Sequence, residues 1–384
     1  MPAQAGEEIS EFRLLCSGTL YRGKVLGHDW RKSDVCRLVL DGRIVLFNAS
    51  QPADDYPQEL MLRIPVSMVT ESTMNAEGVS SVTKFGFPHR EVATDLAALL
   101  TLLLRRLISV HSQVRILHDS DLSCWLGMQD WPLPVTRAGR IAVWRRRPLG
   151  VLTYSDGHQE IDDRSPPPVP VDSTWLKSIL SELPDMPDAR AIVSCARLYS
   201  QGMELIEERA DVAYQMFIAA AETLAQAALK GYCPTDDEKV STKPALLKRA
   251  KQLGLTDSDA RELCLAATRE LSWTSRKFEK CLMQFAAPWI WQKDELYIEL
   301  EAALPKKENF SEALRFIYRS RSAALHAGEG LAPTAAIGTS PHIPVDAVIA
   351  VLSGKMVLPP VTWFERVVQS ALCSFIESQR PQLK

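Results

Sequence analysis

The sequence has little that would mark a secreted, membrane-spanning or metal-binding protein. Its eight cysteines are scattered along 384 residues without a Cys-x-x-Cys pair, which argues against a zinc knuckle or a disulfide scaffold. The longest apolar run, residues 96 to 104, stops at Arg105 and Arg106 and is far shorter than the roughly 18 residues of a membrane span. The first residues carry acid and no apolar stretch, unlike a signal peptide. We therefore expect a cytoplasmic protein with free thiols.

Several motifs of nucleotide and ester chemistry are also missing. The chain contains no Walker loop, no Gly-x-Gly-x-x-Gly segment and no Gly-x-Ser-x-Gly elbow, so nucleotide hydrolysis, hydride transfer and serine esterase chemistry are disfavoured. We expect no metal and no other cofactor. The formal net charge of −3 argues against binding nucleic acid through overall charge, so any RNA contact must come from local patches.

The first part of the chain has the pattern of strands. Residues 11 to 70 contain several apolar, β-branched stretches, and two of them flank Asp41-Gly42, a dipeptide typical of a hairpin with a type I′ turn. Residues 90 to 110 then change to a helical period, which predicts a helix that covers one face of the sheet. We expect residues 1–155 to form a mainly antiparallel β domain with this covering helix.

The second part of the chain is predicted to be helical. Residues 156–172 include the proline cluster from Pro166 to Pro170 and are interpreted as an extended linker. Helices are predicted over 173–182, 187–203, 205–230, 242–253, 257–270, 275–286, 310–328 and 361–379. The expected fold class is therefore α+β, with an all-α domain over residues 173–384.

A basic run precedes the linker and has two interpretations. Trp144 is followed by Arg145, Arg146 and Arg147, with no acid among them. These residues could hold a phosphate backbone, with the tryptophan as a stacking platform. The alternative is a charged edge strand whose tryptophan belongs to the core, and we favour it because charge runs are usually solvated faces.

One residue breaks the apolar pattern of the helix predicted over 310–328. Phe310, Leu314 and Ile317 form an apolar stripe, and Arg321 lies on the same stripe. A guanidinium stays charged in a protein, so Arg321 needs a partner at this position. Glu222, on the shoulder of the apolar face of the helix over 211–229, is the carboxylate that we expect to meet it.

A polar cluster is predicted at the end of the same helix. His326 lies five residues after Arg321, about 140° around the helix and roughly 7.5 Å along it, a distance that an extended arginine can span. Ser322 and Tyr318 share the face of His326. Glycines at 328 and 330 favour the end of the helix, which places His326 in the last turn.

The run Tyr318-x-x-Arg321-Ser322-x-x-x-His326-x-Gly328 resembles the Arg-x4-His signature of HEPN domains, in particular the Apea-like branch. Residues 213–224 resemble the aromatic-x-x-x-Glu-x-Leu helix of that family, and the likeness covers residues 190 to 384. The family consists of all-helical domains, many of them metal-independent ribonucleases of toxin, defence and RNA-processing systems.

The resemblance implies an endoribonuclease in which His326 transfers protons and Arg321 binds the phosphate. Ser322 and Tyr318 would orient these groups, and Glu222 would anchor Arg321. It also implies a homodimer in which two motifs meet, and a defence or antitoxin partner protein. Two alternatives stay open: a non-catalytic module that binds RNA, a nucleotide or a protein, and a purely architectural bundle in which Arg321 is an ion-pair partner of Glu222.

Overall fold

The computed structural model describes about two thirds of the chain. The described residues are 8–16, 20–22, 38–40, 44–48, 58–65, 87–118, 152–155, 158–161, 169–171, 173–206, 209–268, 273–292, 301–327, 333–336 and 357–380. In the strands before residue 87, side chains are described for Phe12, Leu14 and Cys16, and in the helix that ends at Ala327 they are described as far as Ala324.

The backbone of five strands pairs in one sheet. The strands are β1 (Glu8–Cys16), β3 (Leu38–Leu40), β4 (Ile44–Asn48), β5 (Gln58–Pro65) and β6 (Ile108–His118), in the order β3-β4-β5-β1-β6 with antiparallel neighbours. Leu38 pairs with Leu46 across the hairpin predicted at Asp41-Gly42, whose turn lies outside the described residues. Two shorter pairs are β2 (Leu20–Arg22) with β9 (Val169–Val171) and β7 (Leu152–Ser155) with β8 (His158–Ile161).

Helix α1 (Phe87–Leu104) covers the sheet and differs at both ends from the helix predicted over 90–110. It begins earlier because Pro88 lies in the first helical turn, where its missing N–H removes no helical hydrogen bond. It ends earlier because Arg105 has a φ of 51°, in the left-handed region, and β6 begins three residues later. Residues 108–110, which were predicted as helix, therefore belong to the sheet.

The other predicted helices are all present within a few residues of their expected bounds. They are α4 (Ser173–Glu182), α5 (Ala189–Leu205), α6 (Ala210–Ala228), α8 (Pro244–Gln252), α9 (Asp257–Ala266), α10 (Thr274–Phe285), α11 (Phe310–Ala327) and α13 (Val361–Gln379). Short helix α7 (Asp236–Ser241) and 3-10 turns η4 (Leu183–Asp185), η5 (Pro288–Trp291), η6 (Glu301–Ala303), η7 (Lys307–Asn309) and η8 (Pro333–Ala336) join them. None of the described helices combines the length and hydropathy of a membrane-crossing segment.

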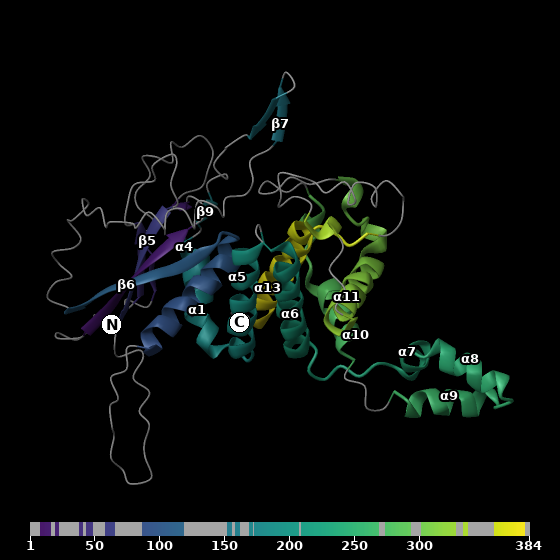
Figure 1. The fold of residues 1–384 in the computed structure, drawn as a ribbon. Coiled ribbons are helices and arrows are strands. Elements are labelled where there is room, and N and C mark those ends of the chain that lie inside the picture. Colours follow the sequence, from purple (N-terminus) through teal and green to yellow (C-terminus); the bar gives the residue numbers. More distant parts are fainter. Residues whose placement is uncertain are drawn as a thin grey trace, which may run out of the picture.

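Helices α5, α6, α10 and α13 form the centre of the molecule, with α1 packed on α5 (Figure 1). Helix α13 is buried over most of its circumference. Gly202 of α5 allows a close approach to α6, because a Cβ at this position would lie 2.5 Å from the Phe217 ring. The packing of α5 against α6 therefore depends on a residue without a side chain.

The expected fold class, a mainly antiparallel β domain followed by an all-α domain, is wrong. Where both backbone and side chains are described, 78% of the residues are helical and only one short strand is present. The buried residues of the N-terminal part lie mostly on α1, and they join α5, α6 and α13 in one cluster. The apolar pattern of residues 11 to 70 indicated a β domain with its own core, whereas the described core belongs mainly to helices.

The limits of the predicted domains stay a prediction. Most of the predicted linker, including residues 162–168, lies outside the described residues. Strands β8 and β9 occupy two short parts of it, and Pro170 fits β9 because a strand paired on one side can leave the other side without a donor.

Helices α7, α8 and α9 form an arm at the end of the molecule far from the sheet (Figure 1). The buried residues of the arm are small or polar apart from one valine, and they are Val240, Ala250, Ala260, Cys264 and Thr268. None of them belongs to the main core cluster. The arm is therefore a separate packing unit.

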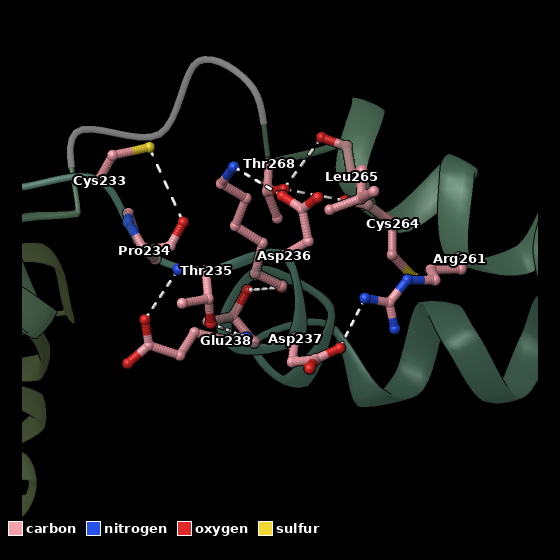
Figure 2. A network of polar contacts seen from close by, with 12 residues as sticks. Cys233, Pro234, Thr235, Asp236, Asp237, Glu238, Arg261, Cys264, Leu265 and Thr268 are labelled. Carbon is pink, nitrogen blue, oxygen red and sulfur yellow. Dashed lines mark hydrogen bonds and ion pairs between the residues drawn. The ribbon is translucent and has the colours of Figure 1, made fainter.

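Capping and ion pairs give the arm its shape (Figure 2). Thr235 begins α7 with a capping box in which Glu238 bonds back to the Thr235 N–H at 2.9 Å. Thr256 caps α9 by accepting from the Asp259 N–H at 3.2 Å. Arg261 of α9 bonds Asp237 of α7 at 2.5 Å.

A buried carboxylate connects the N-terminal and C-terminal parts of the core. Glu365 of α13 has no exposed surface and accepts hydrogen bonds from the Arg105 guanidinium, the shortest at 2.6 Å from Nη2. The Tyr199 hydroxyl of α5 donates to the same carboxylate. The Arg105 guanidinium also lies 6.0 Å from the centre of the Trp289 ring. This group joins α1, α5 and α13 at one point.

Removing the buried carboxylate should be strongly destabilising. We expect Glu365→Ala to lower the free energy of unfolding by about 3–5 kcal/mol, because it removes the buried carboxylate that bonds both the Arg105 guanidinium and the Tyr199 hydroxyl. Glu365→Gln, which keeps an acceptor for Tyr199, should cost less. Urea unfolding measures both, with the exposed Asp257→Ala, whose partner is Lys251, as a control that changes stability little. Equal effects of the buried and exposed substitutions would contradict this role of Glu365.

Candidate functional site

Arg321 of α11 bonds Glu222 of α6, as the sequence predicted. The distance from Arg321 Nη2 to Glu222 Oε2 is 3.1 Å, and the two side chains are 26% and 17% exposed. Leu314 and Ile317, earlier on the same stripe, have no exposed surface. Arg321 thus lies where the buried stripe of α11 reaches the surface, which lets its guanidinium keep contact with solvent while Glu222 fixes it.

Tyr318 completes this group from the preceding turn of α11. Its ring centre lies 5.9 Å from the Arg321 guanidinium carbon and 5.4 Å from the Phe278 ring of α10. Burial raises the pKa of Tyr318 to about 12, and the charge of Glu222 and a hydrogen bond to it act in the same direction, whereas the Arg321 charge acts against them. Tyr318 therefore stays protonated at neutral pH and can donate a hydrogen bond.

The ion pair with Glu222 leaves most N–H donors of the Arg321 guanidinium available to a ligand. A guanidinium has five N–H donors, and one nitrogen of Arg321 bonds Glu222. Among the described residues no other acceptor bonds Arg321. Its remaining donors can form the two parallel hydrogen bonds with which arginine binds a phosphate.

His326 lies in the last turn of α11, as predicted, and its side chain lies outside the described part. Helical geometry separates the positions of Arg321 and His326 by about 140° around the axis. Ser322 is half-buried, and within the described residues it has no side-chain hydrogen bond. The glycines at 328 and 330 also lie outside the described residues. The structure thus brings together Glu222, Tyr318 and Arg321 but not the whole predicted cluster.

The predicted basic run is not part of the described structure. Trp144, Arg145, Arg146 and Arg147 all lie outside the described residues. Both interpretations of this run therefore stay open.

Sequence reasoning missed a second carboxylate beside α11. Glu279 of α10 is 7% exposed and accepts from Ser311 at 2.6 Å and from Arg315 at 2.7 Å. Burial raises the pKa of Glu279, but the hydrogen bonds from Arg315 and Ser311 and the nearby arginine charges outweigh it, so the pKa is lowered. Glu279 lies three residues before the buried Leu282 and so shares its helix face, and a carboxylate at such a position was the signal that could have revealed it.

Glu365 was also missed, although it follows the same rule. It lies within α13, whose residues from Val361 to Leu372 are all buried, and it has no exposed surface itself. Its partners Arg105 and Tyr199 come from distant parts of the sequence, so the pattern of one helix could not identify them. The Glu365 carboxylate with these two partners has a structural role.

The described residues contain no group of three or more His, Cys, Asp or Glu side chains that could hold a metal ion. Comparisons of the chain with protein-family models, with curated proteins and with solved structures gave no match. They neither support nor contradict the resemblance to HEPN domains.

The titration of Tyr318 should reveal its contact with Glu222. We expect Glu222→Gln to lower the Tyr318 pKa from about 12, and to leave it above the ordinary value because burial is the largest cause. The unfolded chain ionises first, so the contribution of Tyr318 to stability is lost as the pH rises through 10 toward 12. Phenolate absorbance, with the Tyr318→Phe spectrum subtracted, measures the pKa. An unchanged pKa in Glu222→Gln would exclude the contact.

Proposed function

We propose that the protein is a metal-independent endoribonuclease of the HEPN type, with Arg321 and His326 as its catalytic residues. The observation that supports this function is the Arg321–Glu222 ion pair, in which a partly exposed guanidinium is fixed on the helix that carries His326. The resemblance of the motif from Tyr318 to Gly328 to the Arg-x4-His signature supplies the reaction class.

In the proposed reaction the 2′-hydroxyl of the RNA is the nucleophile. His326 takes the proton of that hydroxyl while its oxygen attacks the adjacent phosphorus, since an imidazole with a pKa near ~6.5 is suited to proton transfer at neutral pH. The 5′-oxygen leaves and receives a proton from the His326 imidazolium, which returns to its neutral form. The products are a 2′,3′-cyclic phosphate and a 5′-hydroxyl end.

Arg321 stabilises the charge that develops on the phosphate. Its planar guanidinium donates to two phosphate oxygens with the N–H groups that do not bond Glu222. Glu222 keeps the guanidinium in place and uses only part of its N–H donors. Tyr318 and Ser322 orient the substrate or the catalytic pair, and the protonated Tyr318 hydroxyl donates a hydrogen bond in this role.

The proposal includes a homodimer. On one α11 helix Arg321 and His326 diverge by about 140°, so the two residues reach the same phosphate most readily when a second motif faces the first. The partner subunit's His326 then approaches the phosphate that Arg321 binds. We place this dimer in the cytoplasm, within a defence or toxin system that includes a partner protein or antitoxin.

A second candidate function is a non-catalytic module that binds RNA, a nucleotide or a protein. The ion pair favours it in one respect, because a guanidinium held by a carboxylate also suits a site that binds and does not react. The two candidates differ in the role of His326. Only the ribonuclease requires its imidazole for turnover.

Cleavage of RNA in EDTA should distinguish these functions. We expect His326→Ala to lower the rate about 10²–10⁴-fold because general acid–base catalysis is lost. Arg321→Ala should lower it about 10²–10³-fold because the phosphate charge is no longer stabilised. Denaturing gels of a labelled single-stranded RNA measure the rate, and end-group analysis detects the cyclic phosphate.

Arg315→Ala is the matched control, because it removes an equal charge from the same helix but from the Glu279 pair. It should retain cleavage. Binding that survives His326→Ala, together with an absence of cleavage in the unmodified protein, would support the binding module. Wild-type rates in His326→Ala would remove this residue from the mechanism.

The dimer can be tested separately by sedimentation. We expect the full chain to sediment as a dimer at micromolar concentration, and His326→Ala mixed with Arg321→Ala to recover part of the activity. The recovery follows because a mixed dimer holds one intact pair of catalytic groups across its interface. A monomer that cleaves RNA at the full rate would contradict this arrangement.

A further inference from the structure

Helix α8 carries positive charge without any compensating acid. Residues 243–252 contain Lys243, Lys248, Arg249 and Lys251 and no aspartate or glutamate, in a chain whose net charge is −3. Helix α8 belongs to the arm of α7, α8 and α9, which projects from the helical core (Figure 1). The acids of the arm lie on α7 and α9, so α8 is the basic side of an arm that also carries acids.

The exposed residues of α8 all lie on one side. At about 100° per residue they fall within an arc of about 160°. They are Pro244, Ala245, Lys248, Arg249, Lys251 and Gln252, and we call this set the α8 face. Ala250, on the opposite side, is buried in the small core of the arm. The α8 face thus contains three cations, one amide and two small residues.

Two of the three cations on this face have no acidic partner in the described part of the chain. Lys251 bonds Asp257 at 2.7 Å, whereas neither Lys248 nor Arg249 forms an ion pair there. Cations in the last turn stabilise a helix C-terminus, which accounts for Arg249 and Lys251. Lys248 lies before that turn, so its presence needs another explanation.

Acids of the neighbouring helix α7 are already paired with other cations. Asp237 bonds Arg261, and Asp236 bonds Lys239 at 3.0 Å. Glu238 bonds Lys280 of α10 at 2.8 Å, and the Lys280 ammonium also lies 4.5 Å from the centre of the Tyr232 ring. No described acid of α7 or α9 pairs with Lys248 or Arg249, and the Glu238–Lys280 pair connects the arm to α10.

We propose that the α8 face binds the sugar-phosphate backbone of single-stranded RNA. The choice of RNA rests on the proposed ribonuclease function, and the choice of a phosphate backbone rests on the charge of the face. The α8 face has no aromatic residue and no methionine, which are enriched at the centres of protein interfaces. Without an aromatic residue for base stacking, its contacts are with phosphates and do not depend on base sequence.

The test compares two double variants that each lose two positive charges. Lys248→Gln/Arg249→Gln changes the α8 face, and Lys306→Gln/Lys307→Gln changes two exposed lysines beside η7, outside the arm. Both are made in the His326→Ala chain so that the RNA probe is not cut. Fluorescence anisotropy with a labelled single-stranded RNA measures affinity over a range of salt concentrations, and thermal unfolding checks that each variant is folded.

We expect the α8 variant to bind the RNA about tenfold more weakly, and its log–log salt slope to be smaller by about 1.4, as for two lost phosphate contacts. The control pair should change neither quantity as much. The Lys248→Arg/Arg249→Lys variant keeps both positive charges and should bind the RNA as tightly as the parent chain.

Equal losses in the two double variants would overturn the proposal, because they would indicate attraction by overall charge. So would unchanged RNA binding together with lost binding of polyglutamate, which would assign the α8 face to an acidic protein. The ribonuclease proposal fails on a different result, the absence of His326-dependent cleavage, so the two failures are distinguishable.

Discussion

The structure depends on the buried carboxylate of Glu365, whose charge must be balanced by partners inside the protein. Glu365 is inaccessible to solvent near the N-terminal end of α13, where an isolated charge would be very unfavourable. Its partners are Arg105, at the turn between α1 and β6, and Tyr199 on α5. The left-handed conformation of Arg105 ends α1 three residues before β6 begins, and the same residue forms the ion pair.

The same principle operates in three places at different depths. Glu365 is fully buried, Glu279 is nearly so, and Glu222 lies at the edge of the core. Each carboxylate receives an arginine from another helix or turn, and the exposure of that arginine decides what else it can do. The Arg105 side chain is 15% exposed and contacts both Glu365 and Trp289, whereas the Arg321 side chain is 26% exposed and has donors that no described residue uses. The edge of the core is therefore where a ligand can compete for the guanidinium.

The sequence predicted the helices well because their apolar periodicity is local. It also predicted the Arg321–Glu222 pair, since a charge on an apolar stripe requires a carboxylate on the neighbouring helix. It failed on the fold class because a strand pattern does not reveal where the core lies, and α1 joined the helical core. It failed on Glu365 because the partners of that residue are set by tertiary contacts. The arm also escaped prediction, since short helices 244–252 and 257–266 do not show in sequence which core they join.

The arm has a consequence for cooperativity. Its interior is made chiefly of alanine, cysteine and threonine, which bury little apolar surface, and this interior is separate from the main cluster. Units of this kind open with a smaller free energy than the whole molecule. Amide hydrogens of α8 and α9 can therefore exchange with solvent while α5, α6 and α13 stay folded. The length of the arm can also change without loss of the central helices.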